Sequence, residues 1–288
     1  MRFAITGCDR YVNVFEEFLK AGWEPVKLFS VPATNLLDAN SRITTLAERR
    51  GIDVQLTRMN DDDLRDLRER GCEALIVASY NWRIGNWLPY LSYAVNFHPS
   101  PLPLARGPYP LVRAILEDRQ SWAVTCHKLE PEFDSGDILA AEPFSLHAQE
   151  CHESLNLKLQ MASGRLARRV AKNFSTLWEQ SEPQAAGEYW PCFTAAERTL
   201  DFSNSVDAIL RQVRAFGSLE CYAYANGETV YVRRAIGWTE PHNDQPNTVV
   251  HVNNHTIVVA AKDGYIALLE WGLIPAPDPV NIQNPPAL

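Results

Sequence analysis

The sequence of 288 residues has no CxxC pair and no apolar run near the roughly 18 residues that a membrane helix needs. Its six cysteines are dispersed, which is typical of reduced, structural thiols. The alternative is a metal site at His147, Cys151 and His152, but their spacing matches no established ligand pattern. The N-terminal MRFAITG enters a strand pattern directly, without the layout of a secretion signal. We therefore expect a cytoplasmic protein with no metal and no membrane partner.

Positive charge is also scarce. The chain carries 27 Lys and Arg against 35 Asp and Glu, a net charge of -8. A partner held mainly through its phosphates needs a clustered Lys/Arg surface, so this balance disfavours nucleic acid. Gly7 stands alone after the first predicted strand, and the absence of a GxGxxG motif there disfavours a nicotinamide dinucleotide. The 46% of apolar and 22% of charged residues are typical of a globular protein with a substantial core.

Short apolar runs alternate with helical periodicity in the first half of the chain. This pattern predicts an α/β fold in which parallel strands are joined by crossover helices. The predicted strands are RFAITG, EPVKLFSV, ALIVASY and YAVNFH, followed by two antiparallel strands, AVTCHKLE and ILAAEPFSL. Helices are predicted after Val12 and over residues 41–50, 61–70 and 152–178. Because ALIVASY is apolar almost throughout, we expect it in the middle of the sheet.

The pattern changes near residue 180. Residues 181–199 have no sustained period and contain Pro183, Gly187 and Pro191, which predicts a linker between a first domain, 1–180, and a second, 200–288. The second domain begins with a helix and continues with the strand-like runs CYAYA, ETVYVRRA, TVVHV, HTIVVAA and YIALLEW. Asn226-Gly227 and Asn253-Asn254 predict tight turns between these runs, because both pairs tolerate positive φ angles. The Pro-rich end from Pro275 is expected to lie extended on the surface.

Asn96 and His98 end the YAVNFH strand, and ligands of open α/β sheets gather at the carboxyl ends of strands. With Asp134, in the connection PEFDSGD, they offer an amide donor, a proton acceptor and an orienting carboxylate. Attack of an amine on a formyl group uses all three: an N–H for the oxyanion, an acceptor for the amine proton, and a carboxylate that tunes the imidazole or relays the proton through water. The structural alternative is a loop cap, a packed histidine and a turn residue.

The segment VNFHPSPLPLARGPYP resembles the signature of the 10-formyltetrahydrofolate-dependent formyltransferases, in which an N-x-H motif precedes a serine, a Leu/Pro stretch and an Arg-Gly pair. KLEPEFDSGDIL resembles the D-x-G loop of the same family, and the 38 positions between Asn96 and Asp134 agree with the spacing expected there. The resemblance implies a Rossmann-like formyltransferase domain, 10-formyltetrahydrofolate as the formyl donor, and catalytic roles for Asn96, His98 and Asp134.

In this family the pterin ring of folate inserts between the loop after a central strand and the D-x-G loop. The resemblance therefore assigns cofactor contacts to segments 79–85 and 129–134, at Tyr80, Asn81, Trp82, Arg83, Ile84, Leu129, Glu130, Glu132 and Phe133. Trp82 departs from the short apolar residues expected at its position, and packing in the core or in a lid is its alternative role.

The second domain also fits a branch of the family. RTLDFSNSVDAILRQVRAF resembles the opening of the C-terminal domain of methionyl-tRNA formyltransferase and of the bacterial aminoarabinose-pathway formyltransferase, which implies a small, mainly antiparallel, OB-like β domain. Residues 200–288 contain five Lys and Arg against nine Asp and Glu, the wrong sign for tRNA. We therefore favour a small-molecule amine, such as a nucleotide-linked amino sugar or an amino-acid-derived amine, over tRNA.

Contacts to the acceptor are expected where the first strand ends. Asp9 is suited to hold an ammonium group and Arg10 a phosphate or carboxylate, with a helix cap as the alternative role of Asp9. Ser100 and Arg106, in the segment after the N-x-H motif, are further candidates. Two wider alternatives stay open: a homodimer, and a non-catalytic folate-binding protein on the same fold, against which the intact Asn-His-Asp set argues.

Overall fold

The computed structural model describes residues 1–33, 39–225 and 227–274, so Asn226 and the segment from Pro275 lie outside the described residues. The chain folds into two compact units. The first contains Met1–Pro110, Ser121–Ser145 and Asn156–Trp190, and the second contains Leu111–Gln120, Leu146–Leu155 and the chain from Pro191 onward. The second unit thus includes two short segments that lie early in the chain. The predicted domain boundaries at residues 180 and 200 stay a prediction.

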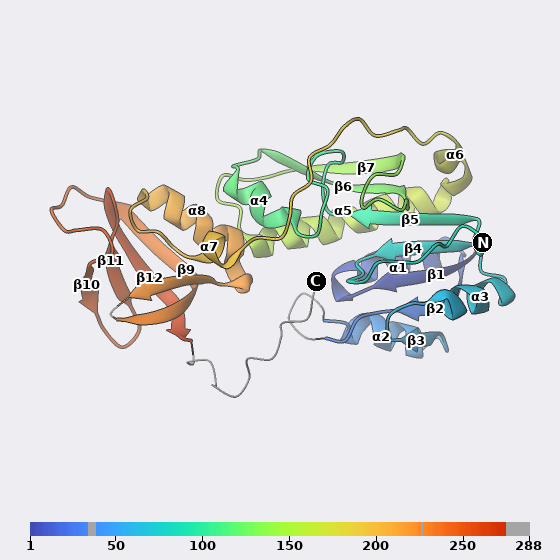
Figure 1. The fold of residues 1–288 in the computed structure, drawn as a ribbon, viewed down its shortest axis with the longest axis horizontal. Helices are drawn as coiled ribbons and strands as arrows, with labels where there is room; N and C mark the ends of the chain where they lie inside the picture. Colours follow the sequence, from blue (N-terminus) through green and yellow to red (C-terminus); the bar gives the residue numbers. More distant parts are fainter. Residues whose placement is uncertain (34–38, 226, 275–288) are drawn as a thin grey trace. The chain divides into compact units, whose positions relative to one another are not determined.

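A seven-stranded sheet forms the centre of the first unit (Figure 1). Its order is β3-β2-β1-β4-β5-β6-β7, with the bounds Asp53–Gln55, Glu24–Phe29, Arg2–Gly7, Ala74–Ala78, Tyr93–His98, Ser121–Lys128 and Ile138–Ser145 in that order. The first five strands pair in parallel, and β6 and β7 join in antiparallel pairing. β4 is the middle strand and is buried along its whole length, which confirms the prediction for ALIVASY.

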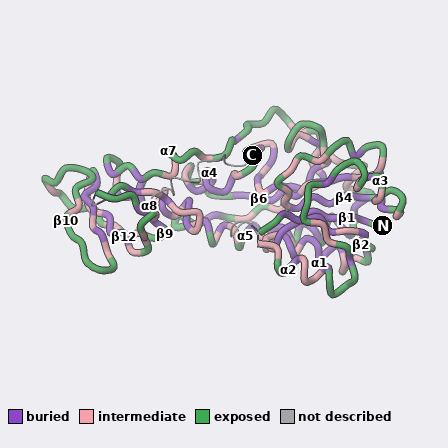
Figure 2. The backbone as a smooth tube through the Cα atoms, turned by 60° about the horizontal axis from the view of Figure 1, so that its bottom comes forward, coloured by how far each residue is buried: buried purple, intermediate pink, exposed green. Residues whose placement is uncertain are grey.

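Helices pack on both faces of this sheet. Neighbouring side chains of a strand point to opposite faces, so a strand that is apolar throughout offers apolar side chains to helices on each side. Phe3 of β1 packs against Phe15 of α1, whereas Ala4 belongs to a cluster with Leu64 of α3. Figure 2 shows β1 and β4 as buried strands. The helices of this unit are α1 (Val12–Lys20), α2 (Ser41–Glu48), α3 (Asp61–Glu69), most of α5 (His152–Lys172) and α6 (Phe174–Glu179). The helices predicted at 41–50 and 61–70 are thus confirmed.

Three local features correct the sequence prediction. The short strand β3 was not predicted, because the three residues DVQ carry no strand period. The helix α4, Pro110–Leu116, was not predicted either, because it follows a Pro-rich segment. The single helix predicted over 152–178 is wrong, since it breaks at Asn173 into α5 and α6. The side-chain amide of Asn173 donates to the carbonyl of Arg169 at 2.9 Å, an alternative bond that competes with continued helix.

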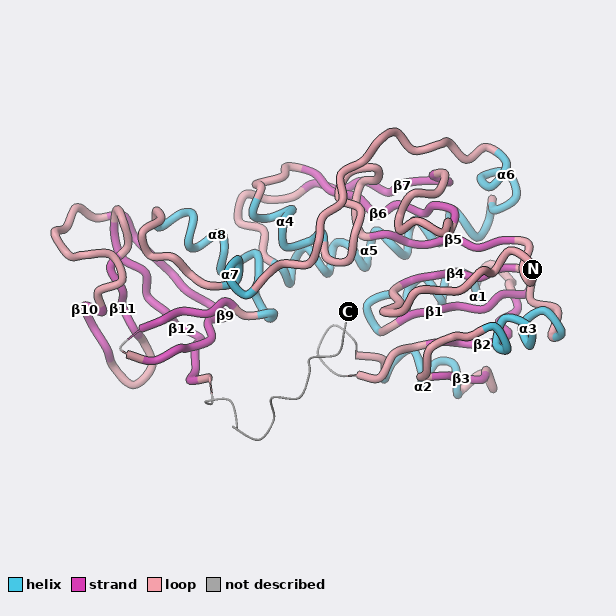
Figure 3. The backbone as a smooth tube through the Cα atoms, in the orientation of Figure 1, coloured by secondary structure: helices cyan, strands magenta, loops and turns pink. Residues whose placement is uncertain are grey.

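The second unit is mainly strand, as Figure 3 shows for the chain beyond residue 200. After α7 (Ala195–Arg198) and α8 (Val206–Phe216) comes an antiparallel sheet in the order β10-β11-β12-β9-β8. Its strands are β8 (Cys221–Ala225), β9 (Glu228–Thr239), β10 (Val249–Val252), β11 (Ile257–Ala260) and β12 (Gly264–Leu273). The predicted helix and five strands are confirmed. In the described part of the chain, no helix is both long and apolar enough to cross a membrane.

The turn between β10 and β11 forms in a different way from the one predicted. Among the described residues with positive φ, neither Asn253 nor Asn254 is found. The side-chain oxygen of Asn253 accepts hydrogen bonds from the backbone N–H groups of His255 and Thr256, both at 2.8 Å. A side-chain cap, rather than a left-handed backbone, therefore closes this turn.

Candidate active site

Strand β5 supplies two of the predicted catalytic residues. Asn96 and His98 are separated by one residue, so their side chains leave the strand on the same face. β5 pairs with β6, and the register places Asn96 directly opposite His127. The side chains of such a pair lie close together on one face, and the amide nitrogen of Asn96 lies 3.2 Å from Nε2 of His127.

The predicted carboxylate converges on the same point. Asp134 lies in the connection between β6 and β7, in the left-handed region with φ 55°, which Asp tolerates better than most residues. Its Oδ1 accepts a hydrogen bond from Nδ2 of Asn96 at 3.2 Å and lies 3.2 Å from Nδ1 of His98. Its Oδ2 accepts a hydrogen bond from the backbone N–H of Gly107 at 2.9 Å. The structure thus brings the three side chains named from the sequence into one cluster.

Both ring nitrogens of His98 face oxygen atoms that can only accept. Nδ1 faces the carboxylate of Asp134, and Nε2 lies 3.0 Å from the carbonyl oxygen of Ala105. A proton on Nδ1 lets the ring donate to Asp134, and a proton on Nε2 lets it donate to the carbonyl oxygen of Ala105. The side chain is 5% exposed, so its ring is enclosed by the protein. In this arrangement His98 is a donor to Asp134.

His127 is a site residue that the sequence analysis did not identify. It is 1% exposed, and its Nδ1 lies 2.7 Å from the carbonyl oxygen of Lys128, which fixes the proton on Nδ1. In the neutral ring, Nε2 is then an acceptor for the second N–H of Asn96. Nε2 also lies 3.6 Å from Oδ1 of Asp134. The only signal in the sequence was a histidine on a strand that was predicted next to the N-x-H strand.

The environment of Asp134 favours its ionised form. Burial by itself would raise the pKa of this carboxyl, since a charge is costly away from water. The neighbouring rings of His127 and His98 and the backbone N–H of Gly107 act against it and hold the pKa of Asp134 well below its usual value. Asp134 is therefore a carboxylate that other groups have been arranged to stabilise.

The segment after β5 is held by backbone and buried side chains. Ser100 is fully buried, and its hydroxyl donates to the carbonyl of Leu104 at 2.8 Å, so it supports the turn of the chain. Gly107 has φ 115°, and a Cβ at this position would lie 2.2 Å from the carbonyl oxygen of Trp190. Only glycine fits at position 107, and its backbone N–H donates the hydrogen bond that Oδ2 of Asp134 accepts. Gly107 therefore shapes this loop, and acceptor contacts of Ser100 and Arg106 stay a prediction.

The two segments assigned to folate lie against each other. Arg83, from the segment after β4, donates to the carbonyl of Pro131 at 2.8 Å, and its guanidinium lies 5.8 Å from the ring centre of Phe133. Phe133 is 58% exposed, which leaves a large apolar surface beside Asp134. Tyr80 accepts a bond from the N–H of Met59 at 2.7 Å. The other residues of these segments that were assigned to folate are Asn81, Trp82, Ile84, Leu129, Glu130 and Glu132.

Asp9 and Arg10, the residues assigned to the acceptor, follow β1. Oδ1 of Asp9 accepts hydrogen bonds from the backbone N–H groups of Arg42 and Ile43, at 2.8 and 2.9 Å, in the first turn of α2. The alternative role of a helix cap is therefore present, although the capped helix is α2 rather than α1. The guanidinium of Arg10 lies 5.9 Å from the ring centre of Tyr109, which comes two residues after Gly107.

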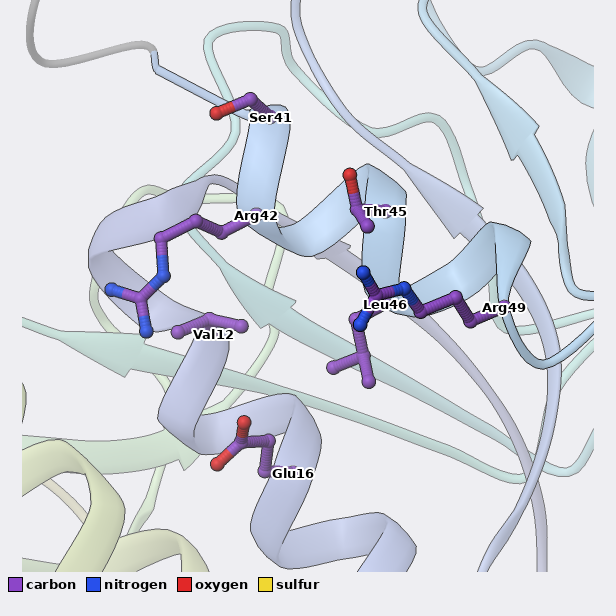
Figure 4. A pocket seen from close by; sticks show the side chains of 7 residues that line it. All are labelled: Val12, Glu16, Ser41, Arg42, Thr45, Leu46 and Arg49. Atoms are coloured by element: carbon purple, nitrogen blue, oxygen red, sulfur yellow. The ribbon is translucent and has the colours of Figure 1, made fainter.

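A cavity of about 420 Å³ lies between α1 and α2 (Figure 4). It is lined by Val12, Glu16, Ser41, Arg42, Thr45, Leu46 and Arg49. Asn96, His98, His127 and Asp134 are not among the residues that line this cavity. Because the capping contact of Asp9 holds the start of α2, the cavity begins close to the end of β1.

No group of three or more metal-ligating side chains gathers among the described residues, and all six cysteines are unpaired. Cys8, Cys72, Cys126 and Cys221 are buried, and burial raises the pKa of the Cys72 thiol to about 11. A thiol with such a pKa is not a nucleophile near neutral pH.

Known proteins resemble this chain in sequence. A family model described as formyl transferase, C-terminal domain, matches residues 193–274. The methionyl-tRNA formyltransferase of Methylibium petroleiphilum is 27% identical over 290 residues, which cover 94% of this chain and 91% of that protein. The chain is thus similar in sequence to formyltransferases along nearly its whole length, and residues 193–274 match the C-terminal domain of these proteins. Not every relative in this family aligns so fully: the methionyl-tRNA formyltransferases of Pseudothermotoga lettingae and Anaplasma marginale are 27% and 32% identical, over 60% and 55% of this chain. The chain spans 58% and 53% of their lengths.

Solved structures of formyltransferases share the fold. WlaRD, a sugar 3N-formyl transferase with dTDP and 5-N-formyl-THF, has a TM-score of 0.67 at 15% identity and covers 93% of this chain and 97% of its own. An N-formyltransferase of Helicobacter canadensis, in complex with folinic acid and dTDP-3-aminofucose, has a TM-score of 0.66 at 16% identity and covers 94% and 99%. The Rossmann-like sheet and the antiparallel second unit are thus the two parts expected for this family.

Proposed function

We propose that the protein transfers the formyl group of 10-formyltetrahydrofolate to the primary amine of a small-molecule acceptor. The observation that carries the proposal is the convergence of Asn96 and His98 on one carboxylate oxygen of Asp134, in a chain similar in sequence to formyltransferases. These are the donor, the imidazole and the carboxylate that amine attack on a formyl carbon uses.

Asn96 is proposed to stabilise the oxyanion that develops when an amine adds to a formyl carbonyl. Its amide nitrogen carries two N–H groups, directed to Asp134 and to His127. The bond to a neutral ring is weaker than the bond to an ionised carboxylate, so the N–H directed to His127 is the one proposed to be shared with the oxyanion. Such a donor contributes about 100- to 1000-fold to the rate.

Asp134 is proposed to hold the attacking amine and to direct its proton. The amine nitrogen loses one proton in the reaction, and the departing nitrogen of the donor gains one. Because its pKa lies below the usual range, Asp134 is a weak base by itself, and a bound water that it orients is the proposed carrier between the two nitrogens. His98, as a donor to Asp134, keeps the carboxylate ionised and oriented.

The folate donor is proposed to bind along segments 79–85 and 129–134. The contact of Arg83 with Pro131 and Phe133 supports this assignment, because it joins both segments at the side of Asp134. The exposed ring of Phe133 offers an apolar surface for a pterin ring. Two structural relatives were solved with a formylated folate, 5-N-formyl-THF in one and folinic acid in the other, which supports the same class of ligand here.

A small, anionic amine such as a nucleotide-linked amino sugar is our proposed acceptor. Arg10 faces the loop that carries Gly107, and Arg42 and Arg49 line the cavity near the end of β1. These cations suit a phosphate group whose amine end reaches Asp134. The acidic balance of residues 200–288 supports a small acceptor over a polyanion.

Charged initiator tRNA is the second candidate, and the relatives named methionyl-tRNA formyltransferase support it, one of them along 94% of this chain. A direct test supplies 10-formyltetrahydrofolate with a panel of dTDP- and UDP-linked amino sugars, free amino acids or methionyl-tRNA, and follows release of tetrahydrofolate. Formylation of a sugar nucleotide but not of tRNA supports the proposal. Formylation of methionyl-tRNA but not of any sugar nucleotide would make tRNA the acceptor instead. Donor binding without turnover on any acceptor would favour a folate-binding protein.

A further inference from the structure

The segment around residues 182–190 was interpreted from sequence as linker, yet it is bonded to the loops of the candidate active site. The backbone N–H of Glu182 donates to the carbonyl of Ile138 at 3.0 Å, and Arg106 forms an isolated parallel bridge with Tyr189. The N–H of Trp190 donates to the carbonyl of Arg106 at 2.7 Å. The segment therefore crosses both the loop after β5 and the loop that carries Asp134.

Gln184, which lies in this segment, makes three hydrogen bonds to the two loops, and each bond requires a particular end of its amide. Its Nε2 donates to the backbone carbonyls of Asp134 and Gly136, at 3.0 and 2.6 Å. Its Oε1 accepts from Nη2 of Arg106 at 3.1 Å. Two carbonyl oxygens need a donor and a guanidinium needs an acceptor, so the orientation of the amide is determined by its surroundings.

The loop of Asp134 needs such support because of its backbone. Asp134 lies at φ 55°, and a Cβ on Gly136 would lie 2.1 Å from the carbonyl oxygen of Lys128, so the loop is both left-handed and tightly packed. A residue in such a conformation persists only when its surroundings hold it. The bonds from Gln184 to residues 134 and 136 hold the loop at those two positions.

The carboxylate of Asp134 is tied to the same segment by a second route. It accepts the N–H of Gly107, and the neighbouring Arg106 donates its backbone N–H to Glu188 at 3.0 Å. We propose that Gln184, together with Arg106, is a positioning residue that sets where the Asp134 carboxylate meets the substrate. This inference rests on the proposed formyl transfer for its catalytic consequence, and on geometry alone for the position of Asp134.

The kinetic test compares Gln184→Met and Gln184→Glu with the wild type in the tetrahydrofolate release assay. Gln184→Met keeps the size of the side chain and removes all three bonds, whereas Gln184→Glu keeps an acceptor for Arg106 and removes both donors. Because misplacement of a reacting group by about 1 Å costs on the order of 100-fold, we expect kcat to fall by about 10- to 100-fold in both variants. The KM for the folate donor should stay within about threefold, because the hydrogen bonds of Gln184 go to the backbone of residues 134 and 136 and to Arg106, and none of these residues is assigned a side-chain contact to folate.

Gln180→Ala is the matched control, because Gln180 lies in the same part of the chain and is exposed at the end of α6. It should keep the wild-type kcat. Thermal unfolding of each variant reports whether it is folded, and Gln184→Glu remains the test if Gln184→Met does not fold. Wild-type kcat in a folded Gln184 variant would overturn the inference, as would a loss confined to KM.

A readout independent of catalysis separates this inference from the proposed function. The backbone N–H of Gly107 is bonded to Asp134, so its hydrogen-exchange rate, measured by NMR, reports the position of the carboxylate. We expect exchange to rise by about tenfold in both Gln184 variants and to stay unchanged in Gln180→Ala. Unchanged exchange in a Gln184 variant overturns the positioning role even if the wild type transfers no formyl group. Raised exchange with an inactive wild type would count against the proposed function alone.

Discussion

Two aspartates that each follow a strand of the first sheet have different partners. Oδ1 of Asp9 accepts two backbone N–H groups at the start of α2, groups that cannot change their protonation. Oδ1 of Asp134 faces the rings of His98 and, at a longer distance, His127, together with the amide of Asn96. The comparison teaches that position after a strand makes a carboxylate available, whereas its partners decide whether it stabilises a helix or takes part in proton chemistry.

The largest expected effect comes from removing the charge of Asp134. Asp134→Asn keeps the shape of the side chain but replaces one of the two carboxylate oxygens by an NH2 group. Either His98 or the backbone N–H of Gly107 then loses the oxygen that accepts its hydrogen bond. We expect kcat/KM for formyl transfer to fall by about 1000-fold, within the range for a group that handles protons. Asp9→Asn is the control and should stay within about twofold, since Asn also caps helices. Equal losses in both variants would remove the distinction between the two aspartates.

A smaller effect is expected for His127, which holds the second N–H of Asn96. His127→Phe keeps a ring in the buried position and removes the acceptor, so the Asn96 amide loses one of its two anchors. We expect kcat to fall by about tenfold while KM for both substrates changes little. His251→Phe, at an exposed histidine of β10, is the control. A variant of His127 with unchanged kcat would show that Asp134 alone orients Asn96.

Asp134 should also make the stability of the protein depend on pH. The folded-state pKa of Asp134 lies below the unfolded value near 3.8, so its contribution to stability is present above that value. It is lost as the pH falls from the unfolded value toward the lower folded one. Between about pH 6 and about pH 3, wild-type protein should lose at least about 1 kcal/mol more stability than Asp134→Asn. Parallel curves from denaturant unfolding would contradict this.

The smallest expected effect concerns the helix cap. Asp9→Ala removes the acceptor for the N–H groups of Arg42 and Ile43, and we expect it to lower the free energy of unfolding by about 1 kcal/mol. Asp9→Asn should restore most of that loss, because its side-chain oxygen can accept the same bonds. If Asp9→Ala instead keeps its stability and raises KM for the amine acceptor, Asp9 contacts substrate and the capping contact is secondary.

Much of the fold follows from local patterns. The continuous apolar run at 74–78 indicated a strand buried on both faces, and it is the middle strand of the sheet. The helix predicted over 61–70 is α3, and in the structure the side chain of Asn60 caps its beginning, a contact between residues that are near in the chain. β3 was missed because a three-residue strand is held by pairing with β2 rather than by its own pattern.

The candidate site was predicted only in part. Asn96, His98 and Asp134 could be named because two motifs, each contiguous in the chain, mark them. His127 needed the register of β5 against β6, which a single sequence does not specify. Gln184 needed the path of a segment without periodic pattern, which crosses loops far away in the chain.

The amino-acid sequence by itself determined most of the helices and strands and the two motifs that carry the chemistry, because these depend on contiguous residues. Only the tertiary structure decided which groups surround each carboxylate: a helix N-terminus for Asp9, and two histidines, an amide and a backbone N–H for Asp134. Hydrogen bonds act over about 3 Å, so the partners of a side chain are set by the folded path of distant segments.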